Sequence, residues 1–586
     1  MKLNLRCGKP GGRLVGFLAV LGVTCGLMVG IPASGRGEDG GENAGEAAAG
    51  PADPVDEALV MEIALDVGES QPAPAADPAV DPAAEVGEVP DSGPGIAAVA
   101  APVGPGAGPV DAAPPAALPL RCRVKLDVTG ELIAPAGRDA PPIRRPITVD
   151  ARFDFEETAV REAAVPTVSR TYTDAVAALQ IGGEEVVTSL ANDARRLLVV
   201  RQGTTPEPYL EDAFLTAAER DLLSLPFDAV LLDDLLPRAA VAVGEAWEVA
   251  ADLAAGLLAI DTIESGTIKA RLEEVTDGRG RMTLSGSVEG WVDGVPARLT
   301  VSGGCAAPAR EVDADAADSQ APAWRIEPRV DHVSVVIRER RQAGHVAPGL
   351  DVEARLVVAR SPAAGTGSGQ QRLAVHERAA TGKNIQDTTV IQDVTMETRR
   401  RGPGRPGRVW HRDAAGRFDL VHDARWRTVE DGSTGLVMRL VDRGALVGQC
   451  SVVAGVAGDA PPTIADVRSD IERSLAGQVT GIDEATEEER ADGVRIVRVV
   501  SSGAAAGLPF TWIQSVLVGT NGGRVDVTCM VQASMRERFA DADRDLVGSL
   551  MPGDARAGQA APDAVPTAIR EARTPGGPAS PPAVPR

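Results

Sequence analysis

The chain has 586 residues, 44% of them hydrophobic and 24% charged, with a formal net charge of -24. That length allows two or three domains, and the ordinary fraction of charged residues excludes both a membrane protein with many spans and a wholly disordered chain. The acidic excess is concentrated, because residues 37–120 hold 16 Asp or Glu and no Lys or Arg. Such a charge balance does not favour nucleic acid as a partner.

Residues 1–36 have the layout of a secretory leader. Basic side chains are followed by an apolar run over 14–31 and by small residues at 33–35, which is typical of a signal peptide. The run is also just long enough to span a bilayer, so an uncleaved N-terminal anchor is the alternative. We expect an exported protein of the periplasm or cell surface, which touches the membrane only through such an anchor.

Three segments are expected to lie outside folded domains. Residues 37–118 form an acidic linker rich in Ala, Pro and Gly, and 553–586 form a similar tail; both have too little apolar surface to offset the entropy lost on ordering. Residues 362–406 form a linker that leads into the basic Arg/Gly/Pro run at 399–408. We interpret that run as a flexible basic joint, with contact to an anionic partner as the functional alternative.

Residues 119–361 are predicted to form a β-rich domain. Apolar and polar residues alternate in 121–128 and 147–155, which indicates antiparallel strands with one buried and one solvated face. Thr216 begins a predicted helix with a capping box, and apolar segments at 227–236 and 250–258 follow it. A curved sheet with these helices resembles, in architecture, the half-barrels of periplasmic lipoprotein carriers, which hold an acyl chain between sheet and helices. The alternative is that the helix leucines simply fill the core.

Residues 407–552 are predicted to form an α+β domain. A helix is expected after Thr463, a hairpin around 520–523 and an amphipathic helix near the end. The segment Phe418–Trp426, the helix after Thr463 and the closing sequence 545–550 together resemble the PsbP-like fold, an antiparallel sheet flanked by helices. That resemblance implies a fold that generally binds or assembles with other components, and it carries no catalytic motif.

The two-domain layout also resembles uncharacterised exported two-domain proteins of planctomycete-type bacteria. The segments that carry this resemblance are 344–351 and 439–444. It implies a compartment and an architecture but no activity.

Four cysteines follow the leader, and each shares strand parity with core residues. An exported protein can oxidise thiols, so the possible disulfides are one within each folded region. Four buried free thiols are the alternative, since sequence does not show the separation of the Cα atoms. The residues concerned are Cys122 with Cys305, and Cys450 with Cys529.

No other residue pattern indicates a catalytic, metal or cofactor site. A His422–Asp423 pair acting on Cys450 is one hypothesis, but a histidine on a surface strand explains the pattern better. We expect no cofactor. The five histidines lack the spacing of metal ligands; they are His332, His345, His376, His411 and His422.

The sequence therefore predicts an exported cell-envelope protein of non-enzymatic binding or scaffolding type. Its partner would be an unknown envelope protein. A carrier of a lipid or other apolar ligand in the β-rich domain is the alternative, and a hydrolase without a recognisable motif is a third class.

Overall fold

The computed structural model describes residues 119–134, 141–160, 163, 165–312, 322–344, 346–363, 400–455, 461–475, 477–505 and 507–553. It also describes two short strands in the predicted leader, β1 (Leu18–Ala19) and β2 (Gly22–Val23). The rest of the predicted leader, the acidic linker, most of the 362–406 segment and nearly all of the tail lie outside the described residues. Within the described part of the chain, no helix combines the length and apolar character needed to cross a membrane.

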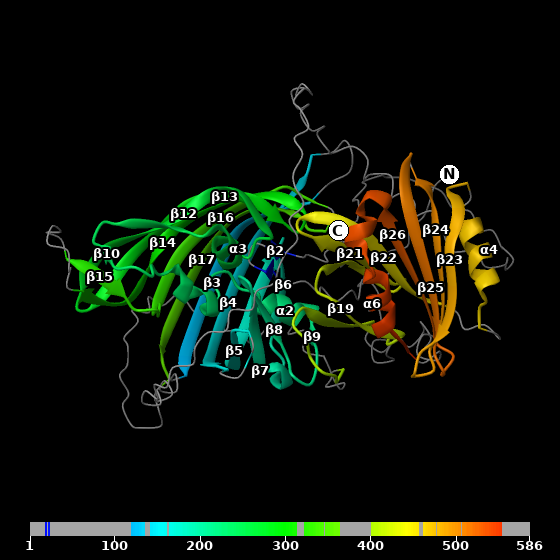
Figure 1. Ribbon diagram of the computed structural model, residues 1–586, viewed down its shortest axis with the longest axis horizontal. Coiled ribbons are helices and arrows are strands. Elements are labelled where there is room, and N and C mark those ends of the chain that lie inside the picture. Colours follow the sequence, from blue (N-terminus) through cyan, green and yellow to red (C-terminus); the bar gives the residue numbers. More distant parts are fainter. Residues whose placement is uncertain are drawn as a thin grey trace, which may run out of the picture. The chain divides into compact units, whose positions relative to one another are not determined.

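Fourteen strands between residues 120 and 362 form one open antiparallel sheet (Figure 1). Its main path runs β11-β12-β13-β14-β16-β17-β3-β4-β5-β7-β8, so β11 and β8 are its edges; β6 pairs with β5, and β15 joins β14 to β10. The strands are β3 (Leu120–Ala134), β4 (Ile143–Ala159), β5 (Thr167–Ile181), β6 (Glu184–Ser189), β7 (Arg196–Gln202), β8 (Thr205–Tyr209), β10 (Val241–Ala242), β11 (Ala246–Val249), β12 (Thr262–Thr276), β13 (Arg279–Val292), β14 (Val295–Val312), β15 (Ala323–Ile326), β16 (His332–Arg341) and β17 (Gly349–Pro362).

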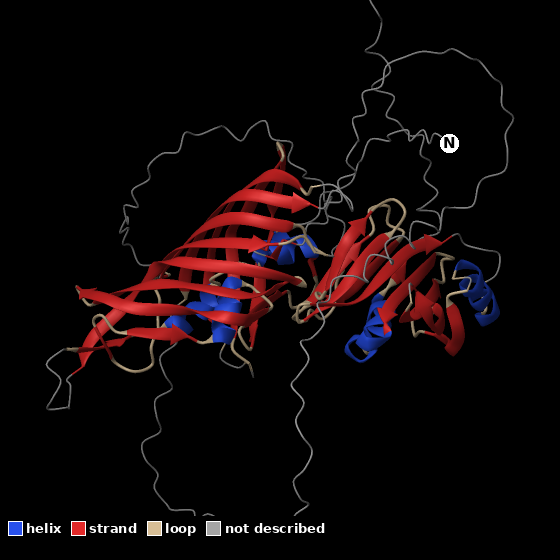
Figure 2. Ribbon diagram, turned by 90° about the horizontal axis from the view of Figure 1, so that it is seen from above, coloured by secondary structure: helices blue, strands red, loops and turns tan. Residues whose placement is uncertain are grey.

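Short helices cover one face of this curved sheet (Figure 2). They are α2 (Ala217–Leu223), the 3-10 helix η3 (Ala229–Leu235) and α3 (Ala251–Leu258); a further 3-10 turn, η2 (Asn192–Ala194), precedes β7. Their buried apolar side chains join the inward residues of the strands in one hydrophobic core. Along β3 and β4, buried and exposed positions alternate, which confirms the predicted antiparallel, half-barrel-like architecture with few helices.

The helix predicted at Thr216 begins where the sequence indicated. The Thr216 hydroxyl accepts a hydrogen bond from the Glu219 N–H at 3.2 Å, and the Glu219 carboxylate accepts one from the Thr216 N–H at 3.0 Å. This reciprocal arrangement satisfies two backbone donors that a helix start leaves free.

Residues 400–553 form a second, α+β region around a seven-stranded antiparallel sheet of order β20-β21-β22-β26-β25-β24-β23. Helix α4 packs on one face of this sheet, while α5 and α6 contribute to the core on the other. The strands are β20 (Trp426–Asp431), β21 (Leu436–Asp442), β22 (Ala445–Gly455), β23 (Val479–Glu489), β24 (Arg495–Ala505), β25 (Leu508–Val518) and β26 (Arg524–Gln532), and the helices are α4 (Ile464–Ser474), η5 (Ala533–Met535), α5 (Arg536–Phe539) and α6 (Ala542–Ser549).

A small four-stranded sheet contains strands from both regions. Its order is β27-β19-β18-β9, formed by β27 (Met551–Pro552), β19 (Phe418–Asp423), β18 (Arg408–Arg412) and β9 (Leu215–Thr216). Strand β9 runs parallel to β18, with Leu215 opposite Val409. The backbone of the first region therefore extends a sheet of the second.

Candidate functional site

The most concentrated buried charge lies at the end of an inward-facing row on β16. Val333, Val335 and Ile337 face the core, so the same parity places Glu339 and Arg341 inside. Both are buried, and Glu339 has 0% exposed surface. No sequence motif marks this pair, although a charged residue at an inward position is itself a signal, because burying a charge is costly without a partner.

Three further residues complete this buried charge cluster. Nη1 of Arg341 lies 3.8 Å from Oδ2 of Asp293, and its Nε lies 3.7 Å from Oε1 of Glu339. Asp293 lies in the turn between β13 and β14, and its N–H donates to Oδ2 of Asp261 at 2.9 Å. From β20, Nη2 of Arg427 approaches Oδ1 of Asp293 at 3.2 Å. The cluster thus links the large sheet to the second region.

Burial raises the pKa of two carboxyl groups in this cluster. Burial, followed by the charge of Asp293, raises the pKa of Asp261 to about 6. Burial raises the pKa of Glu339 to about 8, although Arg341 acts in the opposite direction. Neither Glu339 oxygen accepts a hydrogen bond from any described residue. We therefore infer that the Glu339 carboxyl is protonated at neutral pH, since an ion without hydrogen bonds is disfavoured in the core.

The cluster can hold two sheets together, since its ion pairs connect the large sheet to β20. It contains carboxylates and guanidinium groups, which suit ion pairing better than nucleophilic attack. Within the described ranges, no group of three His, Cys, Asp or Glu side chains is arranged to hold a metal ion. The geometry therefore supports a structural and pH-sensitive role.

A second buried network fixes η3 to the large sheet. Nε of Arg170 on β5 donates to Glu157 at 2.8 Å, while Nη1 and Nη2 donate to Asp228 at 2.9 and 2.5 Å. The Arg170 guanidinium also lies 4.8 Å from the centre of the Phe155 ring. Because Asp228 accepts the N–H of Val230 at the start of η3, this network is explained by the fold without a ligand.

His422 is buried, with 2% of its surface exposed, and not on the surface as we expected, and it does not form the nucleophile system considered as a hypothesis. Nδ1 of His422 lies 2.9 Å from the backbone oxygen of Asp423, while the Asp423 carboxylate accepts hydrogen bonds from Arg425. Cys450 belongs to the core of the seven-stranded sheet. Burial lowers the pKa of both His411 and His422 to about 4, so both rings are neutral at neutral pH.

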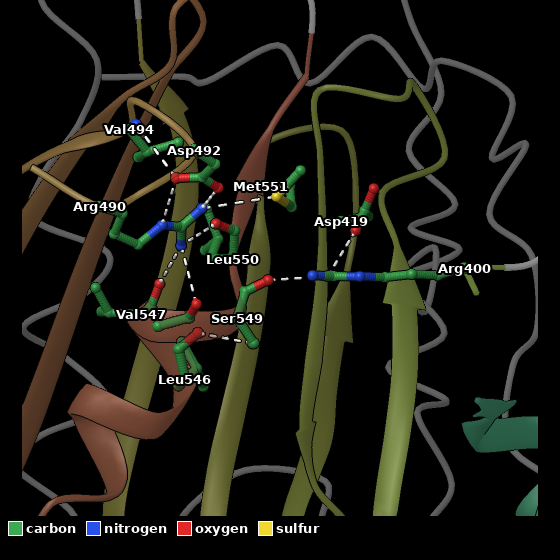
Figure 3. Close-up of polar contacts among 11 residues, drawn as sticks. Arg400, Asp419, Arg490, Asp492, Val494, Leu546, Val547, Ser549, Leu550 and Met551 are labelled. Carbon is green, nitrogen blue, oxygen red and sulfur yellow. Dashed lines mark hydrogen bonds and ion pairs between the residues drawn. The ribbon is translucent and has the colours of Figure 1, made fainter. Parts of the chain in front are cut away.

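An arginine closes the C-terminal end of α6 (Figure 3). Nη1 of Arg490 donates to the backbone oxygens of Val547, Gly548 and Leu550 at 3.1, 3.0 and 2.8 Å. Asp492 holds this guanidinium through contacts of 3.1 and 2.6 Å. The Leu550 N–H already donates to the Val547 oxygen, so the Arg490 cation adds a donor there, supplies donors to the Gly548 and Leu550 oxygens, and complements the helix dipole.

A second arginine reaches the same helix end from the basic run (Figure 3). Nη1 of Arg400 donates to the backbone oxygen of Ser549 at 2.8 Å and to Oδ1 of Asp419 at 2.9 Å. We had assigned Arg400 to a linker, but these contacts show that it belongs to the second region.

The described part of the basic run, 400–408, differs from the flexible joint that we expected. The Gly402 N–H donates to the backbone oxygen of Asp212 at 3.1 Å. Gly404 packs so closely that an added Cβ would lie 1.5 Å from the Leu210 oxygen. The glycines that suggested flexibility instead permit close backbone approach, and the segment is bound to the first region.

Cys122, Cys305, Cys450 and Cys529 are free and buried in this structure. Cys122 on β3 and Cys305 on β14 are separated in the sheet by β17 and β16. Three strand spacings amount to about 14 Å, twice the Cα separation of about 7 Å that a disulfide tolerates, so a Cys122–Cys305 bridge does not fit this sheet. Cys450 and Cys529 lie directly opposite each other on β22 and β26.

One shallow depression of about 480 Å³ lies over β12, β13, β14 and β16. Its lining includes Glu273, Arg281 and His332, with Gly304 and Cys305. Glu273, Arg281 and His332 stand at exposed strand positions, so this hollow lies on the solvated face of the large sheet.

No family model matches the sequence, and no curated protein matches it. Among the solved structures with weak similarity, three have a TM-score of 0.21. Cyanobacterial PsbP (CyanoP) from Synechocystis sp. PCC 6803 is 12% identical and covers 25% of this chain and 92% of its own. The Ran-binding protein Mog1p of Saccharomyces cerevisiae is 11% identical and covers 26% and 97%. Lipovitellin is 7% identical and covers 43% and 26%. The chain thus has weak structural similarity to PsbP-like proteins over about a quarter of its length.

Proposed function

We propose that this chain is an exported cell-envelope protein that acts by binding or scaffolding and not by catalysis. The observation that carries the proposal is the exposed face of the large sheet. On this face Arg121 bonds to Asp154 at 2.8 Å, and Arg338 bonds to Glu353 at 3.0 Å. Because the strands hold these side chains in register, the face is a preorganised polar surface, and preorganisation lowers the entropic cost of binding.

The union of the two regions supports a scaffolding role. The parallel pairing of β9 with β18 and the ion pair between Arg427 and Asp293 join the large sheet to the second region. A backbone pairing combined with a buried ion pair resists relative motion more than a flexible linker does. A partner bound on one region would therefore be held in a defined position relative to the other.

The alternative of a lipid or apolar-ligand carrier requires a hollow between the sheet and its helices. Leu222 in α2, Leu231 and Leu232 in η3 and Leu258 in α3 have 0% exposed surface, and they pack against the strands in one core. A hollow wide enough for a ligand would leave some lining surface open to enclosed water. These leucines therefore favour a filled core.

Site-specific cross-linking in the native envelope tests the binding role. A photoreactive residue in place of Val357, which is 38% exposed on β17, should yield discrete adducts with envelope components. The matched control is Val165, which is 49% exposed but lies outside the strands. Adducts at neither position, or equal nonspecific labelling at both, would contradict binding through the sheet face.

Cell fractionation tests the proposed location separately. The chain should be recovered with the periplasm or the membrane. Recovery of the full-length precursor in the cytosol would contradict export, whatever the cross-linking result.

A further inference from the structure

Two buried thiols face each other across the centre of the seven-stranded sheet. Cys450 on β22 is the direct register partner of Cys529 on β26. Both side chains belong to the same hydrophobic core, with exposed fractions of 0% and 1%. Their approach is therefore set by the backbone ladder and not by the rotation of two surface side chains.

The spacing of this ladder matches the requirement of a disulfide. Residues directly opposite in an antiparallel pair have Cα atoms about 4.5–5.5 Å apart, and disulfides bridge Cα atoms about 4.4–6.8 Å apart. The neighbouring Cys450 thiol, and then burial, raise the pKa of Cys529 well above its ordinary value. No backbone movement is needed to bring the sulfurs into reach.

We propose that Cys450 and Cys529 form a cross-strand disulfide when the chain folds in an oxidising compartment. The two thiols lose two protons and two electrons as the S–S bond forms, and the disulfide of a thiol–disulfide oxidoreductase is reduced to two thiols. This inference rests on the export stated under the proposed function, since a reducing compartment would keep the thiols free.

The chain supplies its own internal control in Cys122 and Cys305. These thiols are also buried, and burial raises the pKa of each to about 12. Two intervening strands, β16 and β17, keep them apart. The same oxidising conditions should therefore leave Cys122 and Cys305 as thiols. Their state distinguishes a bridge that depends on opposed strand positions from unselective oxidation of every thiol.

Burial also determines when the bridge can form. A thiolate must reach the oxidant for exchange to occur, and neither sulfur is accessible once β22 and β26 have paired. The bridge should therefore form while the sheet assembles, and afterwards it should resist reductants until the protein is unfolded.

The test is refolding of the full-length chain in a buffer of reduced and oxidised glutathione. Remaining thiols are alkylated under denaturing conditions, and the digest is analysed by mass spectrometry. We expect a linked peptide containing Cys450 and Cys529, with Cys122 and Cys305 alkylated. Alkylation of all four residues would overturn the inference, and so would random pairing among them.

Two variants guard against a misleading result. The double variant Cys122→Ala with Cys305→Ala should retain the linked peptide, whereas Cys450→Ala should lose it and leave Cys529 alkylated. Persistence of a linked Cys529 in Cys450→Ala would overturn the assignment.

Chain isolated from cells, with alkylation at lysis, separates this inference from the proposed location. A Cys450–Cys529 bridge in the refolded chain and in the chain from cells supports both the inferred pairing and export. A bridge after refolding but free thiols in cells would support the inferred pairing and contradict export.

Discussion

The substitution Glu339→Gln distinguishes two interpretations of the buried charge cluster. If Glu339 is protonated in the folded protein, as its burial and raised pKa indicate, the isosteric amide should stabilise the fold. If it is instead an ionised partner of Arg341, from which it is 3.7 Å away, removing its charge should cost about 3–5 kcal/mol, as for other broken buried ion pairs.

The expected gain follows from the shift in the pKa of Glu339 from 4.5 to about 8 on folding. Because the folded pKa is the higher one, this group contributes its full stability below pH 4.5 and loses it as the pH rises through about 8. One pKa unit is worth about 1.36 kcal/mol, so keeping the carboxyl protonated at pH 7 costs about 3 kcal/mol, and about 1 kcal/mol at pH 5. The Gln variant avoids this cost.

The assay is urea unfolding of both proteins followed by tryptophan fluorescence at pH 5, 7 and 8. The free energy of unfolding of Glu339→Gln should exceed that of the parent by an amount that grows with pH. Glu248→Gln is the control, since Glu248 occupies an exposed position on the edge strand β11 and a surface change should stay within about 0.5 kcal/mol. A less stable Glu339→Gln at pH 7 would refute the reasoning.

Three further predictions concern the buried Arg170 network, the buried His422 ring and the Arg490 contacts at the end of α6. Arg170→Leu leaves Glu157 and Asp228 without their common partner and should cost about 3–5 kcal/mol in urea unfolding; an unchanged midpoint would contradict the role given to this network. His422→Gln removes a base whose pKa falls from 6.5 to about 4 on folding. Since the fold favours the neutral ring, His422 contributes stability above pH 6.5 that is lost as the pH falls toward 4. The variant should therefore lose less stability in acid than the parent, by up to about 3 kcal/mol, in thermal melts between pH 4 and 7. An equally steep fall in melting temperature with falling pH in both proteins would contradict this. Arg490→Met removes the donors at the end of α6 and should cost about 1–3 kcal/mol with faster amide exchange in that helix, and unaltered exchange would disprove the capping role.

Local features of the fold could be predicted because they depend on neighbours a few residues away. Cys122, Val124, Leu126 and Val128 were assigned to one face from their period of two, and all four are buried. Thr216 begins a helix for an equally local reason, since its partner Glu219 is three residues along the chain. Neither assignment needed knowledge of the rest of the structure.

Features that depend on distant partners could not be predicted. Leu215 lies in a strand of two residues that carries no periodic signal, and its partner Val409 is far along the chain. Glu339 could have been flagged by its inward parity on β16, but nothing local identifies Arg427 or Asp293 as members of the same cluster. The basic run was misjudged for a related reason, because glycine permits both flexibility and close backbone packing.

The pairing of the first long strand of the large sheet with its last has a consequence for how the chain folds. Strand β3 pairs with β17, and Leu120 lies opposite Pro362, so the first strand of the region cannot complete its ladder until the last has been made. Contacts this remote in sequence slow folding, because loop closure precedes the energetic gain. The emerging polypeptide therefore carries an unpaired edge along β3 until β17 has been made, and an unpaired edge of this length exposes the incomplete chain to aggregation.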